Sequence, residues 1–437
     1  MKQFLKTAVI HIISWEARLV LKKYKPQIVA ITGSVGKTSS KDAIYTVFKS
    51  SFKVRKSDKS FNSEIGIPLT ILGCPNAWTD LGAWIQNIVK GFSLILFKHN
   101  YPKWLVLEVG ADRPGDIEKV SKWLRPDVTV ITRFAKVPVH VEYFDSPEDV
   151  IKEKSYLAKA VRPGGTLVLN YDDEDVLRLQ ETAKEKVLTY GMTDEANVYA
   201  SNYSILYDEK GEEGATYRVP AGVAFKANFE GNSVPVSIRG GLGKAHIYPV
   251  LGAIAAGLSQ GINLVDIANA LTEHELPPGR MNIIEGNKQS VVVDDTYNSS
   301  PVALNEALET LKILDRQRYK IAVLGDMLEI GKYSVEEHKK AGEKAAGIAD
   351  LLMTVGIRAR HIAEGALEAG MSEKNVFQFD DSREAGKFID QILEPGDIVL
   401  VKGSQGVRME RVVEEIMAHP EEKEDVLVRQ DEEWKRR

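Results

Sequence analysis

The chain has 437 residues, more than one hydrophobic core usually organises, so we expect two or three domains. Its formal net charge of −5 leaves no basic excess, and we expect no nucleic acid among its partners. The single cysteine, Cys74, excludes an intramolecular disulfide and a cysteine-ligated metal cluster. With no recognisable signal peptide, these features predict a protein of the reducing cytoplasm.

Residues 1–26 predict a basic amphipathic helix. The stretch "FLKTAVIHIISWEARLVLKKYK" carries Lys6, His11, Glu16 and Arg18 inside its apolar run and lacks a small-residue cleavage site, which is not typical of a leader. The basic residues of 1–25 suit an anionic surface. Two alternatives stay open for this helix: a docking platform at or near a membrane, or cover for an exposed sheet edge.

Residues 27–280 predict the first α/β domain. Short apolar runs, "QIVAIT", "KWLVLEVG", "DVTVIT", "GTLVLN" and "KVLTYG", are each followed by a turn or a helix start. This alternation is typical of a parallel sheet covered by helices. From residue 195 to 240 the pattern changes to β-hairpins, which we interpret as an antiparallel flank of the same sheet.

Residues 281–420 predict a second, Rossmann-like α/β domain. The punctuation of "ELPPGRMN" marks a domain junction. The alternation then restarts with "SVVVDDTYN", "YKIAVLGDM", "LLMTVG", "NVFQF" and "DIVLVKGS". The charged tail, residues 421–437, is interpreted as frayed or as a solvated helix.

An apolar insertion, residues 77–97, interrupts the first domain with the sequence "AWTDLGAWIQNIVKGFSLILF". Apolar side chains at helical spacing predict one apolar face, and tryptophans at 78 and 84 are typical of a membrane interface. Polar residues interrupt the stretch. Three interpretations stay open: a core or substrate-cleft helix, an interfacial helix, or a transmembrane helix. The apolar face comprises Leu81, Ile85, Ile88 and Phe92, and the interruptions are Asp80, Gln86, Asn87 and Lys90.

The stretch "IVAITGSVGKTSS" predicts a phosphate-binding loop between a strand and a helix. Glycines allow backbone N–H groups to surround phosphate oxygens, the helix N-terminus adds a positive dipole, and a lysine adds charge. The general P-loop has a further glycine where this chain has Ile31. The predicted nucleotide-binding residues of the loop are Gly33, Ser34, Val35, Gly36, Lys37, Thr38 and Ser39.

The shortened loop "TGSVGKTS" resembles that of the Mur ligases and the folylpolyglutamate synthases. Further blocks follow in order: "NSEIGIPLTIL", "LEVGADRPGDI", "HVEYFDSPEDVIKEK", "LNYDD", "PGRMN", "DDTYNSSP", "VLGDMLEIG" and "VLVKGSQGVRME". Over residues 27–417 they are similar to the branch of the Mur ligases that adds D-alanyl-D-alanine to a UDP-muramoyl peptide. The resemblance implies a central ATPase domain, a C-terminal domain that closes on it, and ATP and Mg²⁺ as cofactors. Only 32 residues precede Gly33, so we expect the family's N-terminal UDP-binding domain to be missing.

The family resemblance implies carboxylate activation by ATP through an acyl phosphate. It assigns Lys37, Lys154 and His140 to catalysis. It also assigns Thr38, Glu108, His140 and a carbamoylated Lys154 to metal binding. At residues 108, 140 and 154 a structural role, or a solvated lysine in the last case, is the alternative.

Further positions match the family's binding residues. For the nucleotide these are Arg280, Asp295 and Asn298; for the substrates, Asn62, Ser63, Asp326, Glu329, Lys402 and Ser404, with loop capping as the alternative for the last four. The chain departs from the family pattern at several places. Ser63 and Arg133 stand where asparagine is usual, and Ile247 and Val250 replace an asparagine pair in "HIYPVLGAIAAG".

The sequence therefore predicts an ATP-dependent amide ligase of peptidoglycan precursor synthesis, acting as a monomer on a muramoyl peptide-like carboxylate and D-Ala-D-Ala. Two alternatives remain open: a Mur or folylpolyglutamate-type ligase for another carboxylate and amine, and a P-loop ATPase without ligase activity. Peripheral membrane contact through residues 1–24 and 77–97 is also left open.

Overall fold

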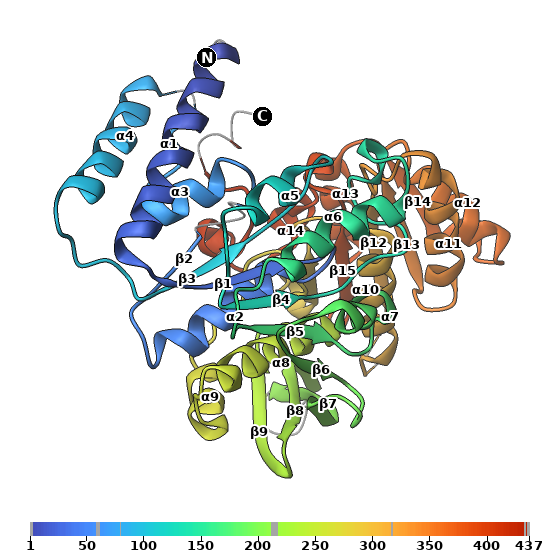
Figure 1. Cartoon of the computed structure of the whole chain (residues 1–437). Helices are drawn as coiled ribbons and strands as arrows, with labels where there is room; N and C mark the ends of the chain where they lie inside the picture. The colour runs from blue at the N-terminus through green and yellow to red at the C-terminus, as the bar shows by residue number, and fades with distance from the viewer. Residues whose placement is uncertain are drawn as a thin grey trace.

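Figure 1 shows the computed structural model of the chain, with the first domain and its helices on one side and the second domain on the other. The structure describes residues 3–57, 62–78, 80–210, 217–315, 318–431 and 434, with the side chains of residues 3–7 and 217 excluded. The predicted features that therefore lie outside the described part are Lys2, the side chain of Lys6, Thr79 of the insertion and residues 432, 433 and 435–437 of the tail.

Nine strands form the first sheet, in the order β2-β3-β1-β4-β5-β6-β7-β8-β9. Neighbours from β2 to β7 pair in parallel, and β7, β8 and β9 pair antiparallel, which confirms the predicted parallel sheet with an antiparallel flank. The strands are β1 (Gln27–Thr32), β2 (Val54–Lys56), β3 (Trp104–Glu108), β4 (Val128–Ile131), β5 (Thr166–Asn170), β6 (Lys186–Gly191), β7 (Val198–Lys210), β8 (Tyr217–Phe229) and β9 (Asn232–Arg239).

Helices cover both faces of the first sheet, because alternate residues of its strands are apolar on both sides. Val29 and Ile31 of β1 pack with α2 (Lys37–Lys49), α8 (Lys244–Ser259) and α9 (Leu264–Leu271). On the opposite face Ile28 and Ala30 pack in one core with five further helices. These are α1 (Gln3–Tyr24), α3 (Gly66–Leu72), α4 (Leu81–Leu96), α5 (Asp116–Ser121) and α6 (Pro147–Lys159).

Six strands form the second sheet, in the order β10-β11-β15-β12-β13-β14, and all pairs except β10 with β11 are parallel. One face packs on α10 (Pro301–Ile313), α11 (Ser334–Ala346) and α12 (Arg360–Glu368), and the other on α13 (Ser382–Ile392) and α14 (Glu410–Ile416). The strands are β10 (Asn282–Glu285), β11 (Val291–Asp295), β12 (Lys320–Gly325), β13 (Leu351–Val355), β14 (Val376–Phe379) and β15 (Ile398–Lys402). The two helix-covered sheets confirm the predicted α/β fold class. The exact boundary between the two domains stays a prediction.

The tail begins as the predicted solvated helix, since α15 (Lys423–Val426) buries none of its residues, but residues 427–429 differ from that interpretation. The short helix is followed by two buried residues. Leu427 belongs to the core of the second domain, and Val428 is buried next to it. The side chain of Arg429 is 5% exposed and pairs with the buried Glu410. The charge of Arg429 suggested solvent contact, but an internal carboxylate compensates it.

The first helix and the insertion pack side by side, away from the second domain (Figure 1). Asp80 caps α4 by accepting a hydrogen bond from the Ala83 N–H at 3.1 Å. Trp84, Gly91 and Leu94 lie on the buried face of α4. Among the described residues, no helix has both the length and the apolarity that a membrane crossing requires.

Glu16 of α1 is fully buried at the contact with α4. A Cβ atom at Gly91 would lie 2.2 Å from its Oε2, so the two helices approach closely there. Neither carboxylate oxygen has a hydrogen-bond partner among the described residues. Burial raises the pKa of Glu16 from 4.5 to about 7.

Replacing Glu16 with glutamine is expected to change how stability depends on pH. The folded state holds the proton more tightly than the unfolded state, so this residue lowers the free energy of unfolding as pH rises from 4.5 to 7, by about 1.4 kcal/mol per pH unit. Urea unfolding at several pH values should show Glu16→Gln gaining stability over the parent with rising pH. Glu195→Gln, at an exposed site, is the matched control. Parallel profiles for all three proteins would contradict the expectation.

Candidate active site

The phosphate loop runs from Gly33 to Thr38, between β1 and α2. Gly33 has a φ of 151°, and a Cβ atom there would lie 1.9 Å from Oγ1 of Thr132 at the end of β4. Oγ1 of Thr132 also donates a hydrogen bond to the Val35 carbonyl at 2.7 Å, and the Ser34 N–H donates to the Arg133 carbonyl at 2.6 Å. The loop is therefore held against β4, where a larger residue than glycine has no room.

The N-terminus of α2 faces the cavity without a side-chain cap. Gly36 is its N-cap with a φ of 84°, and a Cβ atom there would meet nothing within 4 Å. The first N–H groups of a helix lack carbonyl partners within the helix, and the helix dipole favours an anion beside them. Open space at an uncapped N-terminus is the geometry that accepts phosphate.

A cavity of about 630 Å³ lies where the carboxyl ends of the two sheets meet. Most of the predicted site residues line it: Ser34, Val35, Gly36, Lys37, Thr38, Ser39, Asn62, Glu108, His140, Lys154, Arg280, Asp295, Asn298, Glu329 and Lys402. Of the residues that line it, none belongs to α1 or α4 in the described part of the chain.

Thr38, Glu108 and Asn62 form one hydrogen-bonded group. β1 and β3 pair so that Ile31 lies opposite Glu108, which brings this strand-end carboxylate beside the start of α2. Oγ1 of Thr38 donates to Oε2 of Glu108 at 3.0 Å, and Nδ2 of Asn62 donates to Oε1 at 3.3 Å. Glu108 is only 2% exposed, and these two neighbours hold its carboxylate at the cavity wall.

Lys37 and Lys154 place two basic groups close together. Nζ of Lys37 donates to the Gly33 carbonyl at 3.0 Å, and burial lowers its pKa, an effect that the nearby Glu108 opposes. Lys154 of α6 is 4% exposed, and burial, assisted by Lys37, lowers its pKa to about 7. Near neutral pH a substantial fraction of Lys154 is therefore an uncharged amine.

His140 connects the two domains at the cavity. It has a left-handed backbone conformation, with a φ of 68°, and its Nδ1 lies 2.9 Å from Oε2 of Glu329, which follows β12. Its Nε2 lies 3.6 Å from Oδ1 of Asp112. The imidazole lowers the pKa of Glu329. The predicted metal residue and the predicted substrate residue are thus in contact with each other.

Two arginines join the cavity walls of the two domains. One guanidinium nitrogen of Arg280 donates to Oγ1 of Thr38 at 3.1 Å, and its guanidinium lies 4.0 Å over the Tyr297 ring. Arg133, at the position where the family pattern has asparagine, forms an ion pair with Glu306 of α10. The Arg133–Glu306 ion pair and the stacking of Arg280 on Tyr297 both cross between the two domains.

The remaining predicted substrate residues have other partners. Nζ of Lys402 donates to Oδ2 of Asp295 at 2.6 Å and to the Asn298 carbonyl at 2.9 Å. Ser404 and Asp326 do not line the cavity; the first donates to the Ser299 carbonyl, and the second accepts from the Ala359 N–H. Ser63 is also outside the lining, so the substrate roles of these residues stay predictions.

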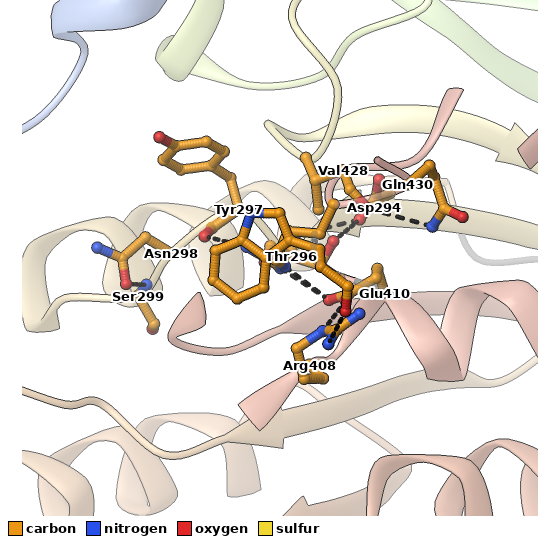
Figure 2. Close-up of polar contacts among 11 residues, drawn as sticks. Asp294, Thr296, Tyr297, Asn298, Ser299, Arg408, Glu410, Val428 and Gln430 are labelled. Carbon is orange, nitrogen blue, oxygen red and sulfur yellow. Dashed lines mark hydrogen bonds and ion pairs between the residues drawn. The ribbon is translucent and has the colours of Figure 1, made fainter. Parts of the chain in front are cut away.

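The C-terminal tail holds the loop that carries Tyr297 (Figure 2). Arg429 donates to the carbonyls of Thr296 at 2.5 Å and Tyr297 at 3.0 Å, and it pairs with Glu410 at 2.8 Å. Thr296 also binds Oδ1 of the buried Asp294, whose pKa burial raises to about 7. The tail therefore fixes the backbone beneath the ring on which Arg280 rests.

Several cavity residues were missed by sequence reasoning. Tyr248 of α8 lines the cavity and donates to Oδ2 of Asp172 at 2.9 Å, beside Ala245 and Pro249. Ile247 and Val250, where the family has asparagines, are instead buried in the core. The block "DDTYNSSP" contains Tyr297 and could have indicated it, whereas no local signal indicates Arg429.

The donor set on the cavity wall fits one magnesium ion. Thr38 and Glu108 present oxygen ligands, which Mg²⁺ prefers, and the ion would neutralise phosphate charge there. Lys154 fits only as a carbamate, because an ammonium group has no lone pair for a metal and Mg²⁺ prefers the oxygen ligands of a carbamate to an amine nitrogen. In the described residues there is no group of three or more His, Cys, Asp and Glu side chains able to hold an ion.

A phosphate loop on a parallel sheet, with a second α/β domain whose junction carries Arg280 to the same loop, defines a two-domain P-loop nucleotide enzyme. The profile of the Mur ligase middle domain matches residues 89–257, and that of the Mur ligase glutamate ligase domain matches residues 279–405. The chain belongs to the Mur ligase family, whose members are ATP-dependent, ADP-forming ligases.

Individual relatives agree over most of the chain. The UDP-N-acetylmuramoyl-tripeptide–D-alanyl-D-alanine ligase of Bacillus subtilis is 27% identical over 405 residues, covering 92% of this chain and 79% of that protein. The MurF ligase of Thermotoga maritima in complex with ADP is 26% identical, with a TM-score of 0.71 over 93% of this chain and 83% of that one. MurF of Acinetobacter baumannii, 22% identical with a TM-score of 0.74 over 93% and 79%, supports the fold.

Replacing Arg429 with methionine is expected to raise the KM for ATP more than it lowers kcat, because the Tyr297 loop and Arg280 lose their support. Glu410 would keep Arg408, 2.5 Å away, but lose Arg429, so the single variant is also expected to be less stable.

The double variant Arg429→Met with Glu410→Gln separates the two effects. It removes the buried carboxylate that lost Arg429 but leaves Arg408 with a neutral partner, so it should recover part of the stability while keeping the raised KM. A double variant with the parental KM would show that the tail acts on stability alone.

Proposed function

We propose that this protein is an ATP-dependent amide ligase of peptidoglycan precursor synthesis that joins D-alanyl-D-alanine to the peptide carboxylate of a muramoyl peptide. The observation that carries the proposal is the single cavity in which Lys37, the Thr38–Glu108 pair and Lys154 meet a wall from the second domain. The relatives named above are ligases of this reaction by their names, and they match across both domains.

The cavity suits the first step, in which a substrate carboxylate oxygen attacks the γ-phosphorus of ATP, forms an acyl phosphate and releases ADP. Two anions must approach each other, so cations have to reduce their repulsion. Lys37 and Arg280 supply this positive charge in the proposal. Burial lowers the pKa of Lys37, and bound phosphate would favour its charged form.

The second step is attack of the dipeptide amine on the acyl carbon, which expels inorganic phosphate and leaves an amide. The amine must lose a proton, so a basic group near the second-domain wall is required. His140 and Glu329, 2.9 Å apart, are the pair that we place at this position. Their contact links dipeptide binding to closure of the two domains.

Magnesium belongs to the proposal at Thr38 and Glu108, where it would neutralise the charge of the phosphates. Lys154 as a carbamate would add an anionic oxygen donor to the opposite wall. The partly neutral amine of Lys154 supports this modification, because only an uncharged amine reacts with CO₂.

The proposed ligation is tested by measuring ADP release with ATP, a UDP-muramoyl tripeptide and D-Ala-D-Ala, each omitted in turn. We expect turnover only with all three substrates. Lys37→Ala should lose at least about a hundredfold in turnover while keeping the parental melting temperature, because it removes transition-state charge stabilisation.

Other outcomes identify the alternatives. Turnover that needs a folate or a different amine would assign another ligase of this superfamily, and turnover without any acceptor would assign a non-ligating ATPase. Parental turnover by folded Lys37→Ala would remove the phosphate loop from the reaction.

Carbamoylation of Lys154 is tested by ¹³C NMR of the protein in ¹³C-bicarbonate. We expect a carbamate resonance that grows as pH rises through about 7, the pKa at which the amine becomes neutral. The signal should be lost in Lys154→Ala and retained in the matched control Lys152→Ala, at an exposed lysine of the same helix. Short-chain carboxylates should partly restore the activity of Lys154→Ala. A fully active Lys154→Ala enzyme would contradict the role.

A further inference from the structure

The outward side of α4 carries an exposed apolar stripe. Its large side chains are 41–70% exposed. At about 100° per residue the members fall within an arc of about 80°, so they form one continuous line along the helix. The stripe comprises Leu81, Ile85, Val89, Phe92 and Leu96.

This stripe is separate from the face that α4 uses for folding. Trp84, Gly91 and Leu94 point to α1 and α3, on the other side of the helix axis. A surface helix ordinarily presents polar residues to solvent once its core face is buried. Helix α4 is apolar on both sides, and exposed apolar surface of this extent marks an interaction site.

The neighbouring helix and the helix ends extend the apolar surface. Trp15 of α1 is 51% exposed, and its ring centroid lies 6.2 Å from that of Phe92. Ile12 of α1 is 38% exposed on the same side of that helix. Trp78 and Phe97, 54% and 64% exposed, flank the two ends of α4. We refer to these four residues with the stripe as the α1–α4 surface.

Positive charge accompanies the α1–α4 surface in an otherwise acidic protein. Residues 1–26 contain six lysines and arginines against one acid, Glu16, and residues 77–103 contain three lysines against Asp80. The whole chain has a net charge of −5. Arg18, Lys22 and Lys25 are exposed along α1, whereas Glu16 is buried. Lys22 follows Trp15 by seven residues and therefore lies on the same face of α1, and Lys23 and Lys25 follow it at the end of that helix.

We propose that the α1–α4 surface docks on the face of an anionic phospholipid bilayer, with α4 lying in the interface plane. Apolar side chains of the stripe enter the acyl boundary, tryptophans lie at headgroup level, and lysines and arginines contact lipid phosphates. A second copy of the chain is a poorer occupant, because two-fold docking would place one basic rim against another.

Docking in this way leaves the catalytic cavity accessible, because neither helix contributes to its described lining. Lys23 fixes the position of α4 relative to α1. Its Nζ donates to the carbonyls of Leu94 and Ile95 at 2.9 Å each, which ties the end of α4 to α1. The pair is thus held as one platform. This inference goes beyond the proposed ligation and does not depend on it.

The experiment is co-sedimentation of the full chain with vesicles of phosphatidylcholine mixed with phosphatidylglycerol, and with pure phosphatidylcholine vesicles. We expect binding to the mixed vesicles that weakens with added salt. Ile85→Asp with Val89→Asp should lower binding at least about tenfold without unfolding the protein, because both side chains are already more than 60% exposed. Ile357→Asp, at a 75% exposed site in the second domain, is the matched control and should bind as the parent does.

A second arm reverses charge with Lys22→Glu and Lys25→Glu, which should reduce binding to the anionic vesicles by about tenfold or more. The proposal is overturned if the parent binds neither vesicle, or if Ile85→Asp with Val89→Asp binds as tightly as the parent. It is also overturned if light scattering finds a dimer that this variant dissociates while no protein binds vesicles. ATP turnover is not the readout, so failure here is distinguishable from failure of the ligase proposal.

Discussion

The close approach of the phosphate loop to the end of β4 is the constraint on which the rest of the site depends. A Cβ atom at Gly33 would collide with Thr132, whose hydroxyl instead binds the Val35 carbonyl. This contact exists because β1 and β4 are neighbours in the sheet. It sets where α2 begins, and hence where Lys37 and Thr38 face the cavity. The parallel partner on the other side, β3, then brings Glu108 to Thr38.

Three basic side chains lie close together beside the phosphate loop. Lys37 lies near Arg280 and Lys154, and burial of the lysines lowers their pKa values. Charged groups of one sign in a partly desolvated site raise the free energy of the unliganded protein. A triphosphate relieves this repulsion, so part of the free energy stored in the site becomes binding energy for the nucleotide.

The strands and the phosphate loop could be predicted from sequence, because each depends on a few consecutive residues. "QIVAIT" matches β1, and "GSVGKT" forms the loop, since strand, turn and helix follow one another directly. Arg429 could not be predicted in this way. Its partners, Glu410 and the Thr296 and Tyr297 carbonyls, are brought together only by the folded second domain. A charged tail suggests solvent contact unless the buried carboxylate that pairs with it is known.

The insertion illustrates a different limit of sequence patterns. Leu81, Ile85, Ile88 and Phe92 were expected to form the apolar face of the helix. Ile88 is half-buried and packs on the core, whereas the other three share a side that is exposed. Packing instead uses Trp84, Asn87 and Gly91, where a small residue and an amide suit the close approach of α1. Periodicity identifies which residues share a face, but it cannot say which of two apolar faces the fold covers. The interpretations of α4 as a structural helix and as an interfacial helix are therefore compatible, because each describes a different side of it.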